Sequence, residues 1–439
     1  MGRVSMVSSC KGFKSHPDIV LKDHLRSVGE ACKRVLEENG IVDESFLLTA
    51  EVVGKTHDFG KYSRYFQDYL NRRGKLGKEL RSHAPISAAY AAWTVYRLLK
   101  GKSDYASLLA SYALLCVHAH HHNLSDSLYN WLELTDLLES ITGNNNYLQQ
   151  LKSIEECVDV ISRELEDLSL TDLREFIKEF RTGLRELKKA IIMTQNQQGL
   201  TFKDFYNLLL LFSVLIYSDK LQAAGLKRSN QREHLIGKLV DLYKQRRFKE
   251  STGQMAAIRE AIYRDAMSSL EQLLKSENIP KVITITAPTG SGKTLLGLST
   301  ALRLREEVYK RTRLLPRIIY VLPYINIIEQ TYDTFADVLR ATGFFEGRDP
   351  LRLLLKHHHL APFEKQDGEE RPLSEVLLLT ESWDSEIVVT TSVQLFETIL
   401  GTRNRMLKKF HKLCNAILIL DEIQTLPLEY WKLIKEALV

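Results

Sequence analysis

The sequence KTHDFGKYSRYF (residues 55–66) places His57 directly before Asp58, with Lys61 three positions later. Imidazole nitrogens and carboxylate oxygens are ligand types that suit borderline transition-metal ions. This stretch therefore indicates a metal site at the end of an apolar helix. Taken alone, the His-Asp pair has a simpler alternative interpretation, which is a solvated or capping polar turn.

Other ionisable residues also stand at helix positions beside apolar sequence. Burying such groups singly costs several kcal/mol unless they are paired or bound to metal. Together with the pair above they predict a site for one or two divalent ions, and neutral imidazoles favour Mn, Fe, Co or Ni over Mg. The additional candidate ligands are His24, His83, His120, His121 and Asp219. Surface or supporting positions are expected for His16, His118 and His122.

A second constellation lies in the other half of the chain, in VITITAPTGSGKTLLG. A strand, a glycine-rich turn and the start of a helix form the P-loop pattern, whose backbone N–H groups approach nucleotide phosphates. Lys293 would neutralise the β- and γ-phosphate oxygens, and Thr294 would ligate Mg²⁺. The expected nucleotide-binding residues here are Thr289, Gly290, Ser291, Gly292, Lys293 and Thr294.

The sequence AILILDEIQTLP supplies the partner of that loop. It reads as an apolar strand that ends in Asp421 and Glu422. Asp421 would hold Mg²⁺ with bound ATP, and Glu422 would act as a catalytic residue by polarising the attacking water. A simple turn after a strand is the alternative interpretation of the acidic pair.

The elements that must position these residues differ between the two halves. Helical spacing predicts helices over 23–40, 84–101, 104–122, 146–168, 171–193 and 202–224. Short apolar runs predict strands at 281–287, 317–323, 351–357, 386–391 and 416–422, and the helical stretches between most of them indicate a buried parallel sheet. Residues 361–375 are charged and lack a period, which is typical of an irregular insertion.

The composition fits a protein of two or three domains, with 439 residues, 44% hydrophobic residues and a net charge of +5. That mildly basic charge permits a nucleic-acid partner. The five cysteines are scattered, which predicts a reduced, cytoplasmic protein. The longest apolar run, 208–217, is too short to cross a membrane and predicts a buried helix.

An isolated His, an HD doublet, a further His, an HH doublet and a late Asp, all on helices, resemble the HD phosphohydrolase superfamily. The form HDFGK…H…HHxxL…SD is similar to its CRISPR-associated nuclease branch. The resemblance implies that Asp58 bridges two metal ions, and Lys61 would face the same site and bind the scissile phosphate. Aligning VHAHHHNL on Val117 and Leu124 favours His120 and His121 as the doublet.

YVLPYINIIEQ and VVTTSVQLFETIL resemble the nucleic-acid-contacting motifs of superfamily 2 helicases, with Thr390, Thr391 and Gln394 as the carried-over contacts. Strand-to-helix turns with N-caps are the alternative for these residues. Gln424 stands where the family's DExH box more often has His. The predicted fold is therefore an all-α HD-type metal phosphohydrolase domain at 1–245, followed by an α/β RecA-like P-loop domain, an incomplete helicase, at 246–439.

This combination resembles the helicase–nuclease of type I CRISPR–Cas systems over nearly the whole chain. It implies single-stranded DNA and an RNA-guided, Cascade-like effector complex as partners, with movement 3′ to 5′ driven by ATP and cutting at the metal site. Basic clusters could line the DNA path: NRRGK, KQRRFK, YKRTR and RNRMLKK. The family's second RecA-like domain and its arginine finger have no counterpart here, so this chain alone is expected to hydrolyse ATP slowly at best.

Two other functions remain open. An HD phosphohydrolase acting on nucleotides, with a regulatory P-loop domain, would release mononucleotides without any nucleic-acid groove. A non-catalytic module that binds nucleic acid or an effector complex would bind without metal dependence. The helicase-like motifs disfavour the former, and the seven candidate ligands disfavour the latter.

Overall fold

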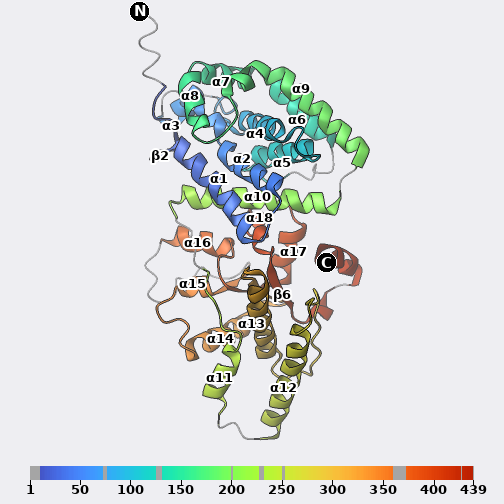
Figure 1. Cartoon of the computed structure of the whole chain (residues 1–439). Helices are drawn as coiled ribbons and strands as arrows, with labels where there is room; N and C mark the ends of the chain where they lie inside the picture. Colours follow the sequence, from blue (N-terminus) through green and yellow to red (C-terminus); the bar gives the residue numbers. More distant parts are fainter. Residues whose placement is uncertain are drawn as a thin grey trace, which may run out of the picture. The chain divides into compact units, whose positions relative to one another are not determined.

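The computed structural model describes residues 10–72, 77–124, 131–198, 201–226, 232–249, 253–358, 372–426 and 428–438. Contacts divide the chain into two compact units (Figure 1). The first comprises Met1–Arg228 and Thr402–His411, and the second comprises Ser229–Gly401 and Lys412–Val439. The sequence suggests a division after residue 245 instead. The units divide earlier because helix α11 (Leu239–Arg247) packs its apolar residues into the core of the second unit.

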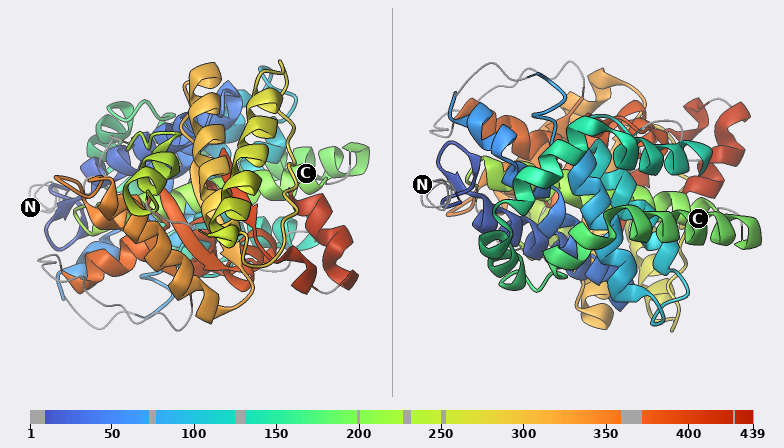
Figure 2. Two further views of the ribbon diagram at one scale, coloured as in Figure 1. Left: turned by 90° about the horizontal axis from the view of Figure 1, so that it is seen from below. Right: turned by 90° about the horizontal axis from the view of Figure 1, so that it is seen from above.

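Within its described residues, the first unit is helical apart from a short antiparallel ribbon, which confirms the expected helical first half. The ribbon pairs β1 (Lys14–His16) with β2 (Ile19–Val20). The helices are α1 (Leu21–Glu38), α2 (Glu44–Thr56), α3 (Arg64–Leu70), α4 (Ala84–Leu99), α5 (Ala106–Ala119), α6 (Trp131–Gly143), α7 (Asn145–Glu155), α8 (Val158–Glu166), α9 (Leu173–Gln198), α10 (Phe202–Ala223) and the short α18 (Asn404–Leu407). In Figure 2, right, these helices appear mainly in blue, cyan and green.

The centre of this unit is formed by α4 and α5, which pack against each other. Both are apolar around nearly their whole circumference, as expected for helices surrounded by protein. Helix α10 begins at a capping box between Thr201 and Asp204, and the run Leu208–Ser218 is buried. Within the described residues, no helix has the length and apolarity that crossing a membrane requires.

Two expectations for the first unit are wrong. The helix predicted over 146–168 is interrupted at Cys157, where α7 ends and α8 begins. Cys10 and Cys157 form a disulfide with Cα atoms 5.5 Å apart, although scattered cysteines predicted a fully reduced chain. The pair could not be predicted from the sequence, because the two cysteines are 147 positions apart and only the fold brings them together.

The second unit is built on a parallel sheet, as predicted. Within the described residues its strand order is β4-β5-β3-β6, and all neighbours are parallel. The strands are β3 (Arg317–Leu322), β4 (Leu354–His357), β5 (Ile387–Thr391) and β6 (Ala416–Leu420). The helices are α11, α12 (Gln254–Leu274), α13 (Lys293–Thr312), α14 (Ile325–Ala341), α15 (Pro350–Leu353), α16 (Leu373–Glu381), α17 (Ser392–Leu400) and α19 (Trp431–Leu438).

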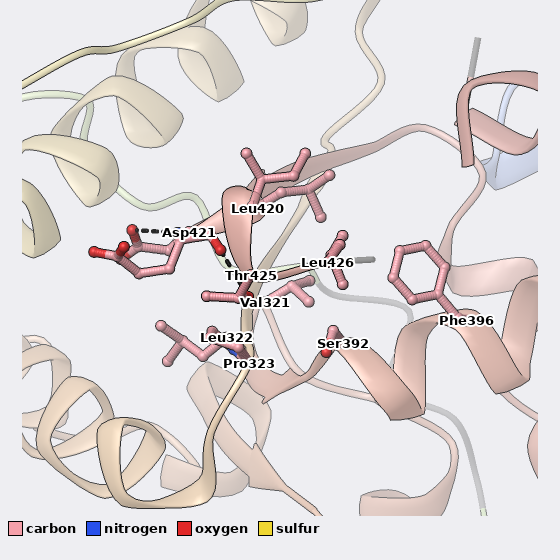
Figure 3. A pocket seen from close by; sticks show the side chains of 11 residues that line it. Val321, Leu322, Pro323, Ser392, Phe396, Leu420, Asp421, Thr425 and Leu426 are labelled. Carbon is pink, nitrogen blue, oxygen red and sulfur yellow. Dashed lines mark hydrogen bonds between the residues drawn. The ribbon is translucent and has the colours of Figure 1, made fainter. Parts of the chain in front are cut away.

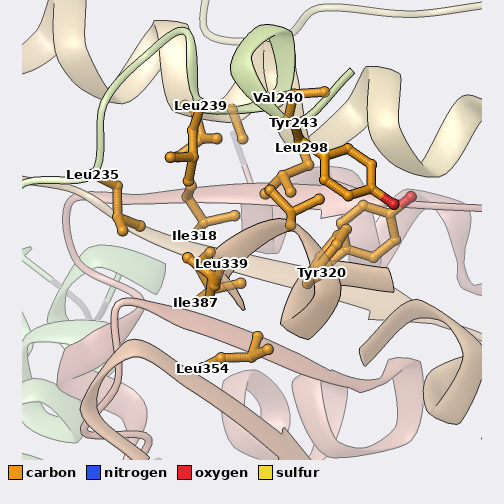
Figure 4. Close-up of a cluster of buried hydrophobic side chains, with 14 of the residues drawn as sticks. Leu235, Leu239, Val240, Tyr243, Leu298, Ile318, Tyr320, Leu339, Leu354 and Ile387 are labelled. Atoms are coloured by element: carbon orange, nitrogen blue, oxygen red, sulfur yellow. The ribbon is translucent and has the colours of Figure 1, made fainter. Parts of the chain in front are cut away.

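Helices α11, α12 and α13 pack together, and α13 also contacts β3 and β6. Figure 2, left, shows the yellow and gold helices beside the orange and red strands. Figure 4 shows how Leu239 and Tyr243 of α11 meet Leu298 of α13 and Ile318 and Tyr320 of β3 in one apolar cluster. The packing of α11 and α12 against α13 places the start of α13 beside the sheet. The predicted P-loop immediately precedes this helix start.

The strand predicted at 281–287 is absent from the sheet. These residues form no strand, and Val282 and Ile285 are 65% and 43% exposed. Ile283 alone among them packs partly against the core. Apolar alternation signals the capacity to form a strand, but a strand also needs a neighbouring edge for its N–H and C=O groups. The predicted insertion at 361–375 lies outside the described residues up to 371.

Candidate metal centre and nucleotide site

The candidate metal ligands meet because two helices cross closely at glycines. His24 lies on α1, and His57 is the C-cap of α2, which ends at Thr56. A Cβ atom at Gly54 of α2 would lie 2.6 Å from the Cα atom of Gly29 on α1. Only two glycines allow this approach of backbones. The crossing brings the rings of His24 and His57 to a centroid separation of 5.2 Å.

Asp58 is the centre of the constellation, and its side chain is 2% exposed. Its Oδ2 atom lies 3.6 Å from His24 Nε2 and 3.5 Å from His57 Nε2. Its Oδ1 atom lies 3.0 Å from His83 Nε2 and 3.5 Å from His120 Nε2. The two oxygens of one carboxylate therefore face different pairs of histidines.

Asp219 and His121 complete the two groups. Asp219, on α10, places Oδ1 3.2 Å from His24 Nε2 and 3.4 Å from His57 Nε2. His121, just after α5, places Nε2 2.9 Å from Nε2 of His83, the residue before α4. All seven residues that the sequence singled out thus lie together. Ligand atoms within 4.8 Å of one another define two groups: His24, His57 and Asp219, and Asp58, His83, His120 and His121.

The donor atoms are arranged as a transition-metal site requires. His57 Nδ1 lies 2.8 Å from Gly54 O, and His120 Nδ1 lies 2.5 Å from Val117 O. Donation from each Nδ1 to a carbonyl leaves the Nε2 lone pair directed at the centre, as in protein metal sites. Within the described residues, five buried atoms here have no hydrogen-bond partner: His24 Nδ1 and Nε2, His57 Nε2, Asp58 Oδ1 and His120 Nε2. Their nitrogen and oxygen chemistry fits Mn, Fe, Co or Ni.

The electrostatics keep the carboxylates charged and two imidazoles neutral. Burial alone would raise the pKa of Asp58, but Lys61, His57 and His83 outweigh burial and hold it well below its usual value. Burial lowers the pKa of His83 to about 4. Burial and the neighbouring imidazoles likewise lower the pKa of His121 to about 2. Ionised carboxylates and neutral imidazoles are the protonation states that bind metal.

Lys61 occupies the position that its spacing from Asp58 predicts. A 3-10 turn, Phe59–Tyr62, brings its Nζ atom to 2.6 Å from Asp58 Oδ2 and 3.3 Å from Ser15 O. His16, for which the sequence suggested a surface or supporting position, lies on β1 with its ring 5.6 Å from the ring of His24. His16 belongs to neither group of candidate ligands.

The end of α5 at Ala119 separates the histidines of HAHHH, which are His118 and His120–His122. His120 and His121 enter the second ligand group, and His118 and His122 belong to neither group. His118 lies on α5 itself, and burial lowers its pKa. The geometry thus agrees with the register chosen from the sequence.

The nucleotide-binding candidates converge in the second unit. Gly290 and Gly292 have φ of +76° and +90°, the left-handed region that favours glycine, and α13 begins at Lys293. Lys293 Nζ donates to Glu422 Oε1 at 3.0 Å, which lowers the pKa of Glu422. Tyr320 of β3 donates its hydroxyl to Asp421 Oδ2 at 2.8 Å.

Thr294 is the second contact of the Tyr320 hydroxyl. Tyr320 thereby links the helix start of the P-loop to the acidic residue that follows β6. Among the other predicted contacts, Thr289 is exposed and Ser291 is buried, with an Oγ atom that has no hydrogen-bond partner in the described chain. These positions suit a phosphate-binding loop, although the segment preceding it is not in the sheet.

The helicase-like turn after β5 is held by internal hydrogen bonds. Thr391 caps α17 by accepting from Gln394 N, and Thr390 donates to His357 O at 2.7 Å. These contacts match the alternative interpretation as a capped strand-to-helix turn. Figure 3 shows a pocket beside this turn, at the ends of β3 and β6. Its lining includes Pro323, Ser392, Phe396, Asp421 and Leu426.

The basic clusters give little support to a DNA path. Arg247 pairs with Asp337 at 2.6 Å, and Arg311 pairs with Glu307 at 2.8 Å. Lys408 and Lys409 of RNRMLKK are buried. These side chains are therefore either paired with carboxylates or buried. NRRGK lies partly outside the described residues.

Comparisons with known proteins find similarity over most of the chain. The family model "Type III restriction enzyme, res subunit" matches residues 247–438. The CRISPR-associated nuclease/helicase Cas3 of Haloferax volcanii is 29% identical over 415 residues, covering 87% of this chain and 42% of the relative. Crystal structures of T. fusca Cas3 with AMPPNP and with ATP each have a TM-score of 0.50 at 15% identity.

These alignments cover 93% and 94% of this chain and 45% and 46% of the T. fusca chains. At this identity, the structural likeness establishes the fold. The chain spans less than half the length of the relatives it matches. The family model covers the second half of this chain, and the similarity to the Haloferax volcanii relative extends over most of its length.

Proposed function

We propose that this chain is a CRISPR-associated, metal-dependent nuclease of HD type joined to an ATP-binding, RecA-like helicase half. One observation carries the nuclease proposal: the two oxygens of the Asp58 carboxylate face two different sets of histidine nitrogens. Such a shared carboxylate suits a pair of divalent ions. The similarity to the CRISPR-associated nuclease/helicase Cas3 of Haloferax volcanii supports a nucleic-acid substrate, for which we propose single-stranded DNA.

His24, His57 and Asp219 would hold one ion, and His83, His120 and His121 would hold the other, with Asp58 between them. Bound divalent ions would make water nucleophilic at neutral pH and offset charge on a phosphodiester. Side chains and carbonyl groups of this chain would orient the ligands and bind the substrate. Carbonyl contacts orient the His57 and His120 rings. Lys61 Nζ stands at the Asp58 carboxylate, where it can bind a phosphate oxygen of the strand to be cut.

In the second half, Lys293 and the N–H groups around Gly290 and Gly292 would bind the phosphates of ATP, and Thr294 and Asp421 would hold its Mg²⁺. The Lys293–Glu422 contact would break when ATP takes the lysine, which frees Glu422 to orient water. In a longer protein, ATP hydrolysis would drive 3′ to 5′ movement. An RNA-guided effector complex in the cytoplasm would deliver the displaced strand during antiviral defence.

The test is cleavage of labelled single-stranded DNA by the purified chain without ATP, in Mn²⁺, Co²⁺, Ni²⁺ or Mg²⁺. The wild type is expected to cut with a transition metal, and Asp58→Ala is expected to bind DNA without cutting it. Asp23→Ala is the matched control, because Asp23 is an exposed carboxylate on α1 beside His24. Equal cutting by wild type and Asp58→Ala would refute the site. Release of mononucleotide products from free nucleotides alone would favour a nucleotide phosphohydrolase.

A further inference from the structure

One segment of the first unit comes from far along the chain. Residues Thr402–His411 belong to this unit, although Gly401 before them and Lys412 after them belong to the second. The segment contains the one-turn helix α18 (Asn404–Leu407). It leads into β6, the strand that precedes Asp421 and Glu422.

The segment is fixed to α10 along its length. His411 Nδ1 lies 2.9 Å from Ser213 Oγ, and His411 N donates to the same oxygen at 3.0 Å. The ring of Phe410 stacks on Tyr206 with an interplanar angle of 15°. Both partners lie on α10, the helix that carries Asp219. The segment therefore has a defined position beside the metal centre.

Asn404 is the residue of this segment that reaches the ligands. Its side-chain Nδ2 donates to His120 O at 3.0 Å and to His122 O at 3.1 Å. Its Oδ1 accepts from Lys220 Nζ at 3.0 Å. Its backbone N donates to Asn123 Oδ1 at 2.9 Å. Every hydrogen-bonding group of this side chain is thus used, on two different elements.

Both elements carry candidate ligands. The last carbonyls of a helix lack intrahelical partners, and α5 ends at Ala119, immediately before His120 and His121. Asn404 supplies donors to the turn that contains both histidines. Its other end holds Lys220, the residue after Asp219. A single amide therefore joins the turn that carries His120 and His121 to Lys220, the sequence neighbour of Asp219.

We propose that Asn404 is a positioning residue for the metal centre, which sets the separation between the His120–His121 turn and Asp219. The inference rests on the proposed metal site. Under this proposal the nuclease centre requires Asn404, a residue from the helicase half of the sequence. A rigid spacing matters because two ions that share the Asp58 carboxylate tolerate little change in the distance between their other ligands.

The experiment compares variants of this 439-residue chain that carry Asn404→Ala, Asn404→Asp or Arg403→Ala. Asn404→Asp keeps the size and the acceptor for Lys220 but replaces the donor to both carbonyls with an oxygen. Arg403→Ala is the control, since Arg403 is the exposed neighbour in the same segment. After chelation, Co²⁺ binding is measured by calorimetry and by the visible absorption of the bound ion. Far-UV circular dichroism and thermal unfolding are recorded without metal.

The wild type and Arg403→Ala are expected to bind two Co²⁺ ions with the same affinity and the same spectrum. Both Asn404 variants are expected to bind Co²⁺ about 10- to 100-fold more weakly, the usual effect of losing a group that orients ligands. Wild-type affinity and spectrum in folded Asn404→Asp would overturn the inference and leave the metal site standing. Absence of Co²⁺ binding by the wild type would instead refute the metal site on which the inference depends. If Asn404→Ala fails to fold, the isosteric variant decides the matter.

Discussion

Replacing Gly54 with alanine would force apart the two helices that carry His24 and His57. The added Cβ would lie 2.6 and 2.8 Å from Gly29 Cα and N, and 2.9 Å from the carbonyl carbon of Val28. All three atoms belong to the backbone, so no side chain can rotate away. Helix α1 must therefore shift, and His24 moves with it.

The magnitude follows from two opposing terms. Alanine in place of glycine within a helix stabilises by about 1 kcal/mol. Overpacking a tight contact destabilises by about 1–3 kcal/mol, and a backbone clash belongs at the upper end. The net loss is about 2 kcal/mol, which corresponds to a fall of about 4–8 °C in the midpoint of thermal unfolding for a unit of this size.

The assay is thermal unfolding of the metal-free chain, followed by Co²⁺ titration of the folded variant. Gly143→Ala is the matched control, because a Cβ there meets no atom within 4 Å. The control is expected to unfold within about 2 °C of the wild type, as a helix-compatible substitution in open space should. Gly54→Ala with wild-type stability and Co²⁺ affinity would refute the reasoning from the helix crossing.

Three further outcomes are expected. Lys293→Ala should weaken binding of a fluorescent ATP analogue by about tenfold or more, through loss of the phosphate-neutralising charge, and leave metal-dependent DNA cutting unchanged; loss of both would contradict it. Burial lowers the pKa of His83 to about 4, so the unfolded chain takes up this proton at higher pH and metal-free stability should fall from about pH 6.5 towards pH 4. Urea unfolding of His83→Gln should show a shallower pH slope, and an unchanged slope would count against this. Cys10→Ser should lower the unfolding free energy by about 2–4 kcal/mol without reductant and match the wild type in its presence; a difference that persists in reductant would argue against the disulfide.

The sequence predicted the elements around Asp58 well, because helix periodicity is a local property. His24, His57 and Asp219 stand at positions where an apolar stripe meets an ionisable group, and burial of such groups demands a partner. Four of the five predicted strands also form, since β-branched and leucine runs bounded by turns mark buried parallel strands.

The failures concern pairings that no local pattern encodes. Residues 281–287 have the alternation of a strand, yet they remain outside the sheet. The Cys10–Cys157 bond and the attachment of Thr402–His411 to the first unit join residues that lie far apart in sequence. Asn404 was missed for the same reason, because it reaches the candidate centre through tertiary structure.

The central claim is that Asp58 stands between two metal ions. The most direct measurement is a crystal structure of the chain soaked in Mn²⁺, with anomalous difference maps recorded above the manganese edge. We expect two peaks on either side of the Asp58 carboxylate, one among His24, His57 and Asp219 and the other among His83, His120 and His121. Absence of any peak at Asp58, or a single peak on other residues, would contradict it.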